Sequence, residues 1–177
     1  MSELSHGAAR KSSAKAIDTK AGEDYNTPMA TTIMTIPRVQ KNWDAVRPFI
    51  GKQQWRCLLD LQRGEEGKFF EDKIAELAAL VQAMPSGGAT DGQGEEAIVQ
   101  LHYFKGGADW WIIEKDEGSP DDAPEEKGRP LQAFGLADLF GDGGELGYIS
   151  IDEVTGLHGE LDLHWIPKTL RECRRRA

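Results

Sequence analysis

The stretch IVQLHYFKGGADWWIIEK, residues 98–115, decides the fold. Its first part, residues 98–104, alternates in side-chain character, two glycines follow at Gly106 and Gly107, and alternation resumes from Trp110 to Lys115. A period of two is typical of a half-buried strand, and a glycine pair between two such runs favours a tight turn. The stretch therefore predicts a β-hairpin.

Further strands are expected after the hairpin, at residues 131–139, 146–150 and 160–165. A glycine-rich turn at 141–144 separates the first two of these. The sequence SIDE, which begins at Ser150, has the spacing of a helix capping box, so a short helix is expected between the last two strands.

The segment before the hairpin has helical periodicity instead. A short helical segment is expected to stop at Gly51, and a second helix is expected around residues 55–61. Apolar residues from Phe70 to Met84 recur at the spacing of one helix face and predict a third helix. Helices followed by strands indicate an α+β fold, with N-terminal helices packed on an antiparallel meander of about five strands.

This pattern divides the chain into four regions. Residues 1–28 are expected to form a disordered arm, 29–90 the helical region, 95–170 the α+β domain and 171–177 a basic tail. Within the α+β domain, residues 116–130 are rich in proline and acidic side chains and are expected to form a solvated loop.

The composition excludes several classes of protein. The chain has 177 residues and only two cysteines, Cys57 and Cys173, so it has no disulfide framework and no cluster of thiolates for a metal. It begins without the apolar run of a signal peptide, and no segment approaches the roughly 20 apolar residues of a membrane span. These features predict a cytoplasmic protein that does not enter a membrane.

Charge is distributed unevenly along the chain, whose net charge is −9. Residues 91–166 carry eighteen acidic side chains and four basic ones, whereas the last eleven residues carry five basic and one acidic. A surface of this sign favours a basic protein partner over a polyanion. Contact with nucleic acid is expected to be weak and confined to four arginines of the tail: Arg171, Arg174, Arg175 and Arg176.

Several ordered blocks of the C-terminal half resemble a bacterial family of unknown function. The blocks are LHYF (101–104), WWIIEKD (110–116), AFGLADL (133–139), GDGGELGYIS (141–150), ELDLH (160–164) and PKTL (167–170). Members of this family look like accessory genes of plasmids and integrative conjugative elements. The resemblance covers roughly residues 97–170 and implies a mobile-element setting, without an established activity or catalytic residues.

One candidate site is a divalent-metal centre. On an extended strand, Glu160, Asp162 and His164 would share one face, and His102 on a neighbouring strand would complete a set of ligands that activates water. Such a centre would make the protein a metal-dependent hydrolase or nuclease. The same alternation is also what any half-buried structural strand shows, so both interpretations stand.

The other candidate site is an acidic protein-binding surface. Adjacent strand residues point to opposite faces, so Trp110 and Trp111 cannot both enter one core, and an exposed indole would anchor a partner. The acidic residues expected around it are Glu114, Asp116, Asp142 and Glu145. Two alternatives to this surface stay open. In the first, both tryptophans are fully buried; in the second, the acidic residues serve only to keep the protein soluble.

The leading hypothesis from the sequence is a non-enzymatic accessory protein that needs no cofactor and binds a basic protein through this surface. An inhibitor that occupies a DNA-binding protein, for example a restriction subunit, is one such role. No Gly-x-Ser-x-Gly elbow, His-Glu-x-x-His motif or dinucleotide fingerprint favours a specific enzymatic reaction. The metal-dependent enzyme, with its divalent cation, is the alternative.

Overall fold

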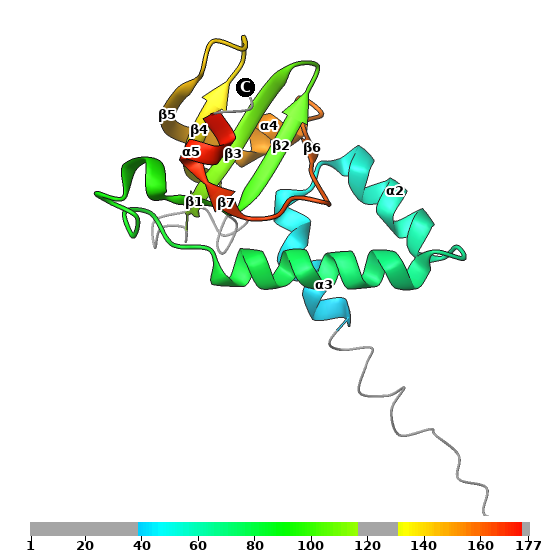
Figure 1. The fold of residues 1–177 in the computed structure, drawn as a ribbon. Coiled ribbons are helices and arrows are strands. Elements are labelled where there is room, and N and C mark those ends of the chain that lie inside the picture. Colours follow the sequence, from blue (N-terminus) through cyan, green and yellow to red (C-terminus); the bar gives the residue numbers. More distant parts are fainter. Residues whose placement is uncertain (1–38, 117–130, 175–177) are drawn as a thin grey trace, which may run out of the picture.

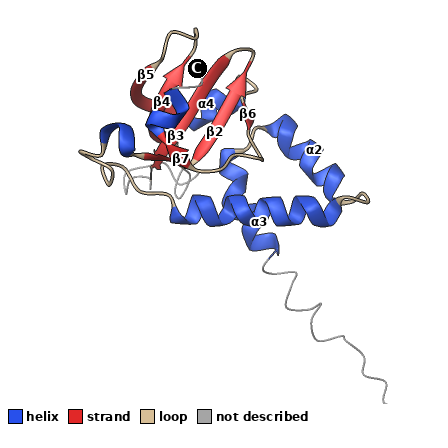
Figure 2. Cartoon of the chain, in the orientation of Figure 1, coloured by secondary structure: helices blue, strands red, loops and turns tan. Residues whose placement is uncertain are grey.

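A twisted sheet forms the upper part of the molecule in Figures 1 and 2, and helices pack against both of its faces. The structure is a computed structural model and describes residues 39–116 and 131–174. Residues 39–46 are helical, followed by η1 (Arg47–Phe49), α2 (Lys52–Gln62), α3 (Gly67–Ala83), η2 (Gly94–Glu96), α4 (Ile151–Gly156) and α5 (Leu170–Arg174). The strands are β1 (Ile98–Val99), β2 (Leu101–Lys105), β3 (Ala108–Lys115), β4 (Gln132–Asp138), β5 (Glu145–Ser150), β6 (Glu160–Leu161) and β7 (Lys168–Thr169).

The main sheet has five antiparallel strands in the order β5-β4-β3-β2-β6, so the α+β fold class is confirmed. Strands β2 and β3 form the predicted hairpin, in which Tyr103 lies opposite Trp110. The predicted capping box also forms, because the Ser150 hydroxyl accepts a hydrogen bond from the Glu153 N–H (3.1 Å) at the start of α4.

Two predicted strands are shorter than expected. Residues 98–104 divide at Gln100, and the first part, β1, pairs with β7 in a separate two-stranded sheet. The strand expected at 160–165 ends after Leu161, because Asp162 starts a turn: its carboxylate accepts the His164 N–H (2.9 Å) and its carbonyl accepts the Trp165 N–H (3.2 Å). Aspartate favours turns through such local hydrogen bonds.

The larger core lies between the sheet and the N-terminal helices. Leu101 and Tyr103 of β2 and Trp110 and Ile112 of β3 point toward these helices. The buried Tyr103 hydroxyl donates a hydrogen bond to the carbonyl of Phe49 (2.7 Å), and burial raises the pKa of Tyr103. This bond joins the sheet to the chain just before α2.

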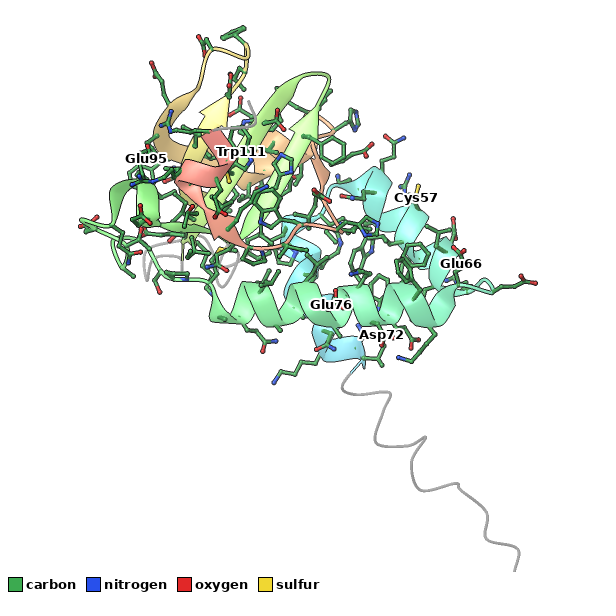
Figure 3. All side chains as sticks on the ribbon, in the orientation of Figure 1. Cys57, Glu66, Asp72, Glu76, Glu95 and Trp111 are labelled. Carbon is green, nitrogen blue, oxygen red and sulfur yellow. The ribbon has the colours of Figure 1, made fainter. Side chains whose placement is uncertain are left out.

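A smaller core fills the opposite face of the sheet. It contains Trp111, Ile113 and Leu136 from the sheet and Leu170 and Cys173 from α5. Figure 3 shows Trp111 among the strands beside α5. Ala97 and Val99, from the start of the α+β region, also belong to this core. The segments that cover this face of the sheet therefore come from both ends of that region.

The two cores together bury both tryptophans of the hairpin. Trp110 is 8% exposed and Trp111 6% exposed, on opposite faces of the sheet. The expected exposed indole is therefore corrected: neither side chain is available to anchor a partner. Within the two described ranges, no helix has the length and apolarity needed to cross a membrane.

Candidate protein-binding surface

Strand β5 is the outermost strand on one side of the main sheet, beyond β4 (Figure 1). The Ile151 N–H donates to the Leu131 carbonyl (3.1 Å), and these two residues lie opposite each other one step beyond the Gln132–Ser150 pair, so this is a hydrogen-bonded position of the ladder. In an antiparallel ladder such pairs recur at every second residue. Ile149 and Gly147 therefore point their backbone groups toward β4, whereas Leu146 and Tyr148 point theirs away from the sheet.

A second observation supports this orientation. Phe134 and Tyr148 are opposed residues, and their rings lie 5.7 Å apart at 70°, an edge-to-face contact. Opposed side chains are closest in the pairs that do not exchange hydrogen bonds. The outward backbone groups at positions 146 and 148 have no neighbouring strand among the residues that the structure describes.

Large apolar side chains lie exposed along this edge. Tyr148 is 76% exposed and Leu146 is 44% exposed, while Phe140 in the turn before β5 is 87% exposed and its neighbour Leu139 is also exposed. Pleating places Leu146 and Tyr148 on the same face of the sheet as Leu136, which belongs to the smaller core. The exposed side chains thus extend a buried apolar surface to the edge of the sheet.

A buried carboxylate holds the turn between β4 and β5. Asp138 accepts hydrogen bonds from four successive N–H groups, those of Phe140 (3.2 Å), Gly141 (2.7 Å), Asp142 (3.2 Å) and Gly143 (3.0 Å). Burial alone would raise the pKa of Asp138, but these hydrogen bonds outweigh it and hold that pKa below its usual value. The turn is therefore fixed while its Phe140 side chain projects outward.

The C-terminal helix holds the same turn from the other side. The Arg174 guanidinium donates to the Gly143 carbonyl (2.6 Å) and also contacts Glu95 (3.2 Å), which Figure 3 shows beside α5. Arg171 pairs with Glu96 (2.5 Å). Both described arginines of the predicted basic tail thus have carboxylate partners; Arg175 and Arg176 lie outside the described residues.

Acidic residues lie next to the exposed apolar residues in the chain. Asp142 in the turn and Glu145 at the start of β5 are both exposed. These are the two predicted binding residues that the structure brings to this edge. We call the set Leu139, Phe140, Asp142, Glu145, Leu146 and Tyr148 the β5 surface.

Glu114, another predicted binding residue, has an internal role instead. It is 3% exposed and accepts hydrogen bonds from Gly88 N–H (2.6 Å), Thr90 N–H (2.6 Å) and the Thr90 hydroxyl (2.5 Å). Burial alone would raise the pKa of Glu114, but these bonds outweigh it and lower that pKa. Glu114 therefore fastens the loop after α3 to the sheet and cannot contact a partner directly.

Asp116 is half-buried at the end of β3, where its N–H donates to the Gln132 carbonyl (3.0 Å). The rest of the expected acidic loop, residues 117–130, and the expected arm, residues 1–28, lie outside the described residues.

The predicted metal ligands do not form one ligand set. His102 lies between two carboxylates, with Nε2 2.7 Å from Asp109 and Nδ1 3.3 Å from Asp162, so the carboxylates approach opposite edges of the ring. His164 lines the same open hollow of about 690 Å³ as His102 and Asp162, but its ring lies against Phe69 (centroids 6.2 Å apart). Glu160 lines a separate hollow of about 180 Å³ next to α2. In residues 39–116 and 131–174 no three His, Cys, Asp or Glu side chains are grouped to hold a metal ion.

Phe140, Leu146 and Tyr148 were not anticipated as binding residues. The signal for Phe140 was its place beside Leu139 in a turn otherwise made of glycine and aspartate. For Leu146 and Tyr148 the sequence carries no such signal, because exposure there depends on which strand lies at the edge of the sheet.

Comparison of the chain with protein-family models, with curated proteins and with solved structures finds no match. The resemblance of its C-terminal blocks to a mobile-element family therefore stays a prediction.

Proposed function

We propose that the protein is a non-enzymatic protein-binding module and that the β5 surface is where it binds. The observation that carries this proposal is the nearly complete exposure of Phe140 on a turn that four hydrogen bonds hold in place. Rigid aromatic side chains lose little entropy on binding and dominate the energetics of many interfaces. A second exposed aromatic residue, Tyr148 on β5, gives the surface another anchor.

Charge supports a basic protein as the partner. Asp142 is exposed in the same turn as Phe140, Glu145 is exposed at the start of β5, and residues 91–166 are strongly acidic. Opposite charge at the rim of an interface speeds association and excludes partners of the same sign. A DNA-binding host protein, such as a restriction subunit, carries a surface of fitting charge and would suit the mobile-element setting that the resemblance implies.

The test is site-specific photocrosslinking in the native host. A photoreactive phenylalanine analogue replaces Phe140 in one variant and Phe69 in a matched control. Phe69 is also an exposed phenylalanine, but it lies on α3, away from the β5 surface. We expect a discrete crosslinked protein with a basic surface from position 140 and not from position 69.

Crosslinking of one protein from both positions, or from neither, would contradict the proposed surface. A second arm raises the salt concentration before irradiation, since attraction between exposed charges is screened by salt. A crosslinked product that forms only from position 140, and whose yield does not fall with salt, would argue against a partner of complementary charge. It would still support the β5 surface as the binding site.

A further inference from the structure

We infer that the β5 surface binds its partner by strand addition: an extended basic segment of another protein pairs with the outer edge of β5, beside which the described residues place no strand. This inference rests on the proposed function and specifies the mode of binding and the chemistry of the partner.

The backbone of β5 provides the first argument. Leu146 and Tyr148 direct their N–H and C=O groups away from β4, as the Ile151–Leu131 hydrogen bond and the strand register require. These groups lie two residues apart, which is the spacing at which an added strand forms its ladder. Unpaired groups of this kind are a template for another strand, and strand addition is a known mode of peptide recognition.

The side chains define what the added strand must carry. Leu146 and Tyr148 project from one face of β5, next to Phe134, so the added segment needs apolar residues on that face. Glu145 projects from the other face, and a β-carbon added at Gly147 on that face would meet no atom within 4 Å. This face has room for a long side chain, and Glu145 makes lysine or arginine the fitting type.

Charge also argues against a second copy of this chain as the occupant. Residues 139–150, which form the turn and β5, contain no lysine or arginine, and the whole chain has a net charge of −9. Two copies paired through these strands would bring acidic groups together without a basic partner. A basic segment of a different protein supplies the missing charge.

The test selects 12-residue peptides from a phage-displayed random library on the full-length protein and measures their affinity for variants. Leu146→Pro removes an outward N–H that β4 does not use, and Leu146→Ala is the matched control that removes only the side chain. We expect the enriched peptides to alternate apolar residues and to contain lysine or arginine. Leu146→Pro should weaken their binding by about tenfold or more, and Leu146→Ala by about threefold or less.

The outcomes separate this inference from the proposed function. If binding falls in Phe140→Ala and Tyr148→Ala but is unchanged in Leu146→Pro, the surface stands and strand addition is wrong. If none of these variants changes binding, the proposed surface itself fails. A selection that enriches no sequence, or enriches only peptides with helical spacing of apolar residues, also overturns strand addition.

Amide hydrogen exchange gives a second readout that needs no variant. In the free full-length chain, the amides of Gly147 and Ile149 should exchange slowly, and those of Leu146 and Tyr148 rapidly. Bound peptide should slow exchange at Leu146 and Tyr148. Slow exchange there in the free chain would overturn the inference, because another part of this chain or a second copy would then already occupy the edge.

Discussion

Proline substitutions at adjacent positions of β5 should have very different effects on stability. Gly147 points its N–H toward β4, opposite Gly135, whereas Leu146 points its N–H to the open side of the sheet. Proline has no N–H, so Gly147→Pro removes a hydrogen bond of the sheet, while Leu146→Pro removes none.

The expected difference follows from what each variant leaves unpaired. In Gly147→Pro a net hydrogen-bond contribution of about 0.5–1.5 kcal/mol is lost, and the carbonyl of the buried Gly135 is left unsatisfied, which costs about 1–3 kcal/mol. The free energy of unfolding should therefore fall by about 1.5–4.5 kcal/mol. In Leu146→Pro only part of a half-exposed side chain is lost, so the fall should stay below about 1.5 kcal/mol.

Urea unfolding at 25 °C, followed by tryptophan fluorescence, measures both values, because Trp110 and Trp111 are buried on the two faces of the sheet. Leu146→Ala and Gly147→Ala serve as controls for the loss or gain of a side chain. Equal destabilisation by the two prolines, or a larger effect at position 146, would refute the orientation of β5 on which the proposed binding mode depends.

Three further predictions concern residues that hold the fold. Glu114→Gln should lower the free energy of unfolding by about 1–3 kcal/mol at pH 7, because the new amide NH₂ would face a buried N–H donor. The difference from wild type should shrink below about pH 4.3. The reason is that a carboxyl group with a lowered folded pKa contributes stability that is lost as pH falls through that folded pKa. Asp138→Asn should lower the protection of the amides of residues 140–143 at neutral pH, measured as exchange rates relative to those of the unfolded chain at the same pH. The wild type should lose the same protection as pH falls below about 3.9 and through the folded pKa, because the folded pKa of Asp138 is lowered. Unchanged protection in both cases would contradict its role in the turn. His158→Gly should raise the free energy of unfolding by up to about 1 kcal/mol, because His158 has φ 65° after the end of α4; an unfolding curve that shifts to lower urea would contradict this.

Local signals in the sequence were sufficient for much of the fold. The hairpin depends on a glycine pair between two alternating runs, and the start of α4 depends on Ser150 and Glu153, three residues apart. Each of these features is decided by side chains and backbone groups within a few residues. The apolar periodicity of α3 is likewise contained within the helix itself.

Contacts between distant segments decided what the sequence could not. The burial of Trp111 depends on α5 and β1, which lie on opposite sides of it in the sequence and form the smaller core together. The Asp162 carboxylate accepts a hydrogen bond from the His164 N–H, and β6 ends just before this turn. A longer strand would have placed Glu160, Asp162 and His164 on one face. Alternation alone cannot distinguish such a turn from a continuing strand.

The position of β5 at the edge of the sheet has the same origin. Strand order is set by the pairing of β2 with β6, which leaves β5 as the last strand on the other side. The exposure of Leu146 and Tyr148 is a consequence of that order, so their binding role became visible only in the folded chain.

The binding role of the β5 surface is tested most directly by the affinity of the partner captured at position 140 for two matched alanine variants. Phe140→Ala removes the exposed aromatic side chain of the β5 surface, and Phe69→Ala removes an exposed aromatic side chain elsewhere. The dissociation constant should rise by about tenfold or more in Phe140→Ala, equivalent to about 1.4 kcal/mol, and stay within about twofold in Phe69→Ala. An unchanged dissociation constant in Phe140→Ala, or an equal rise in both variants, would contradict it.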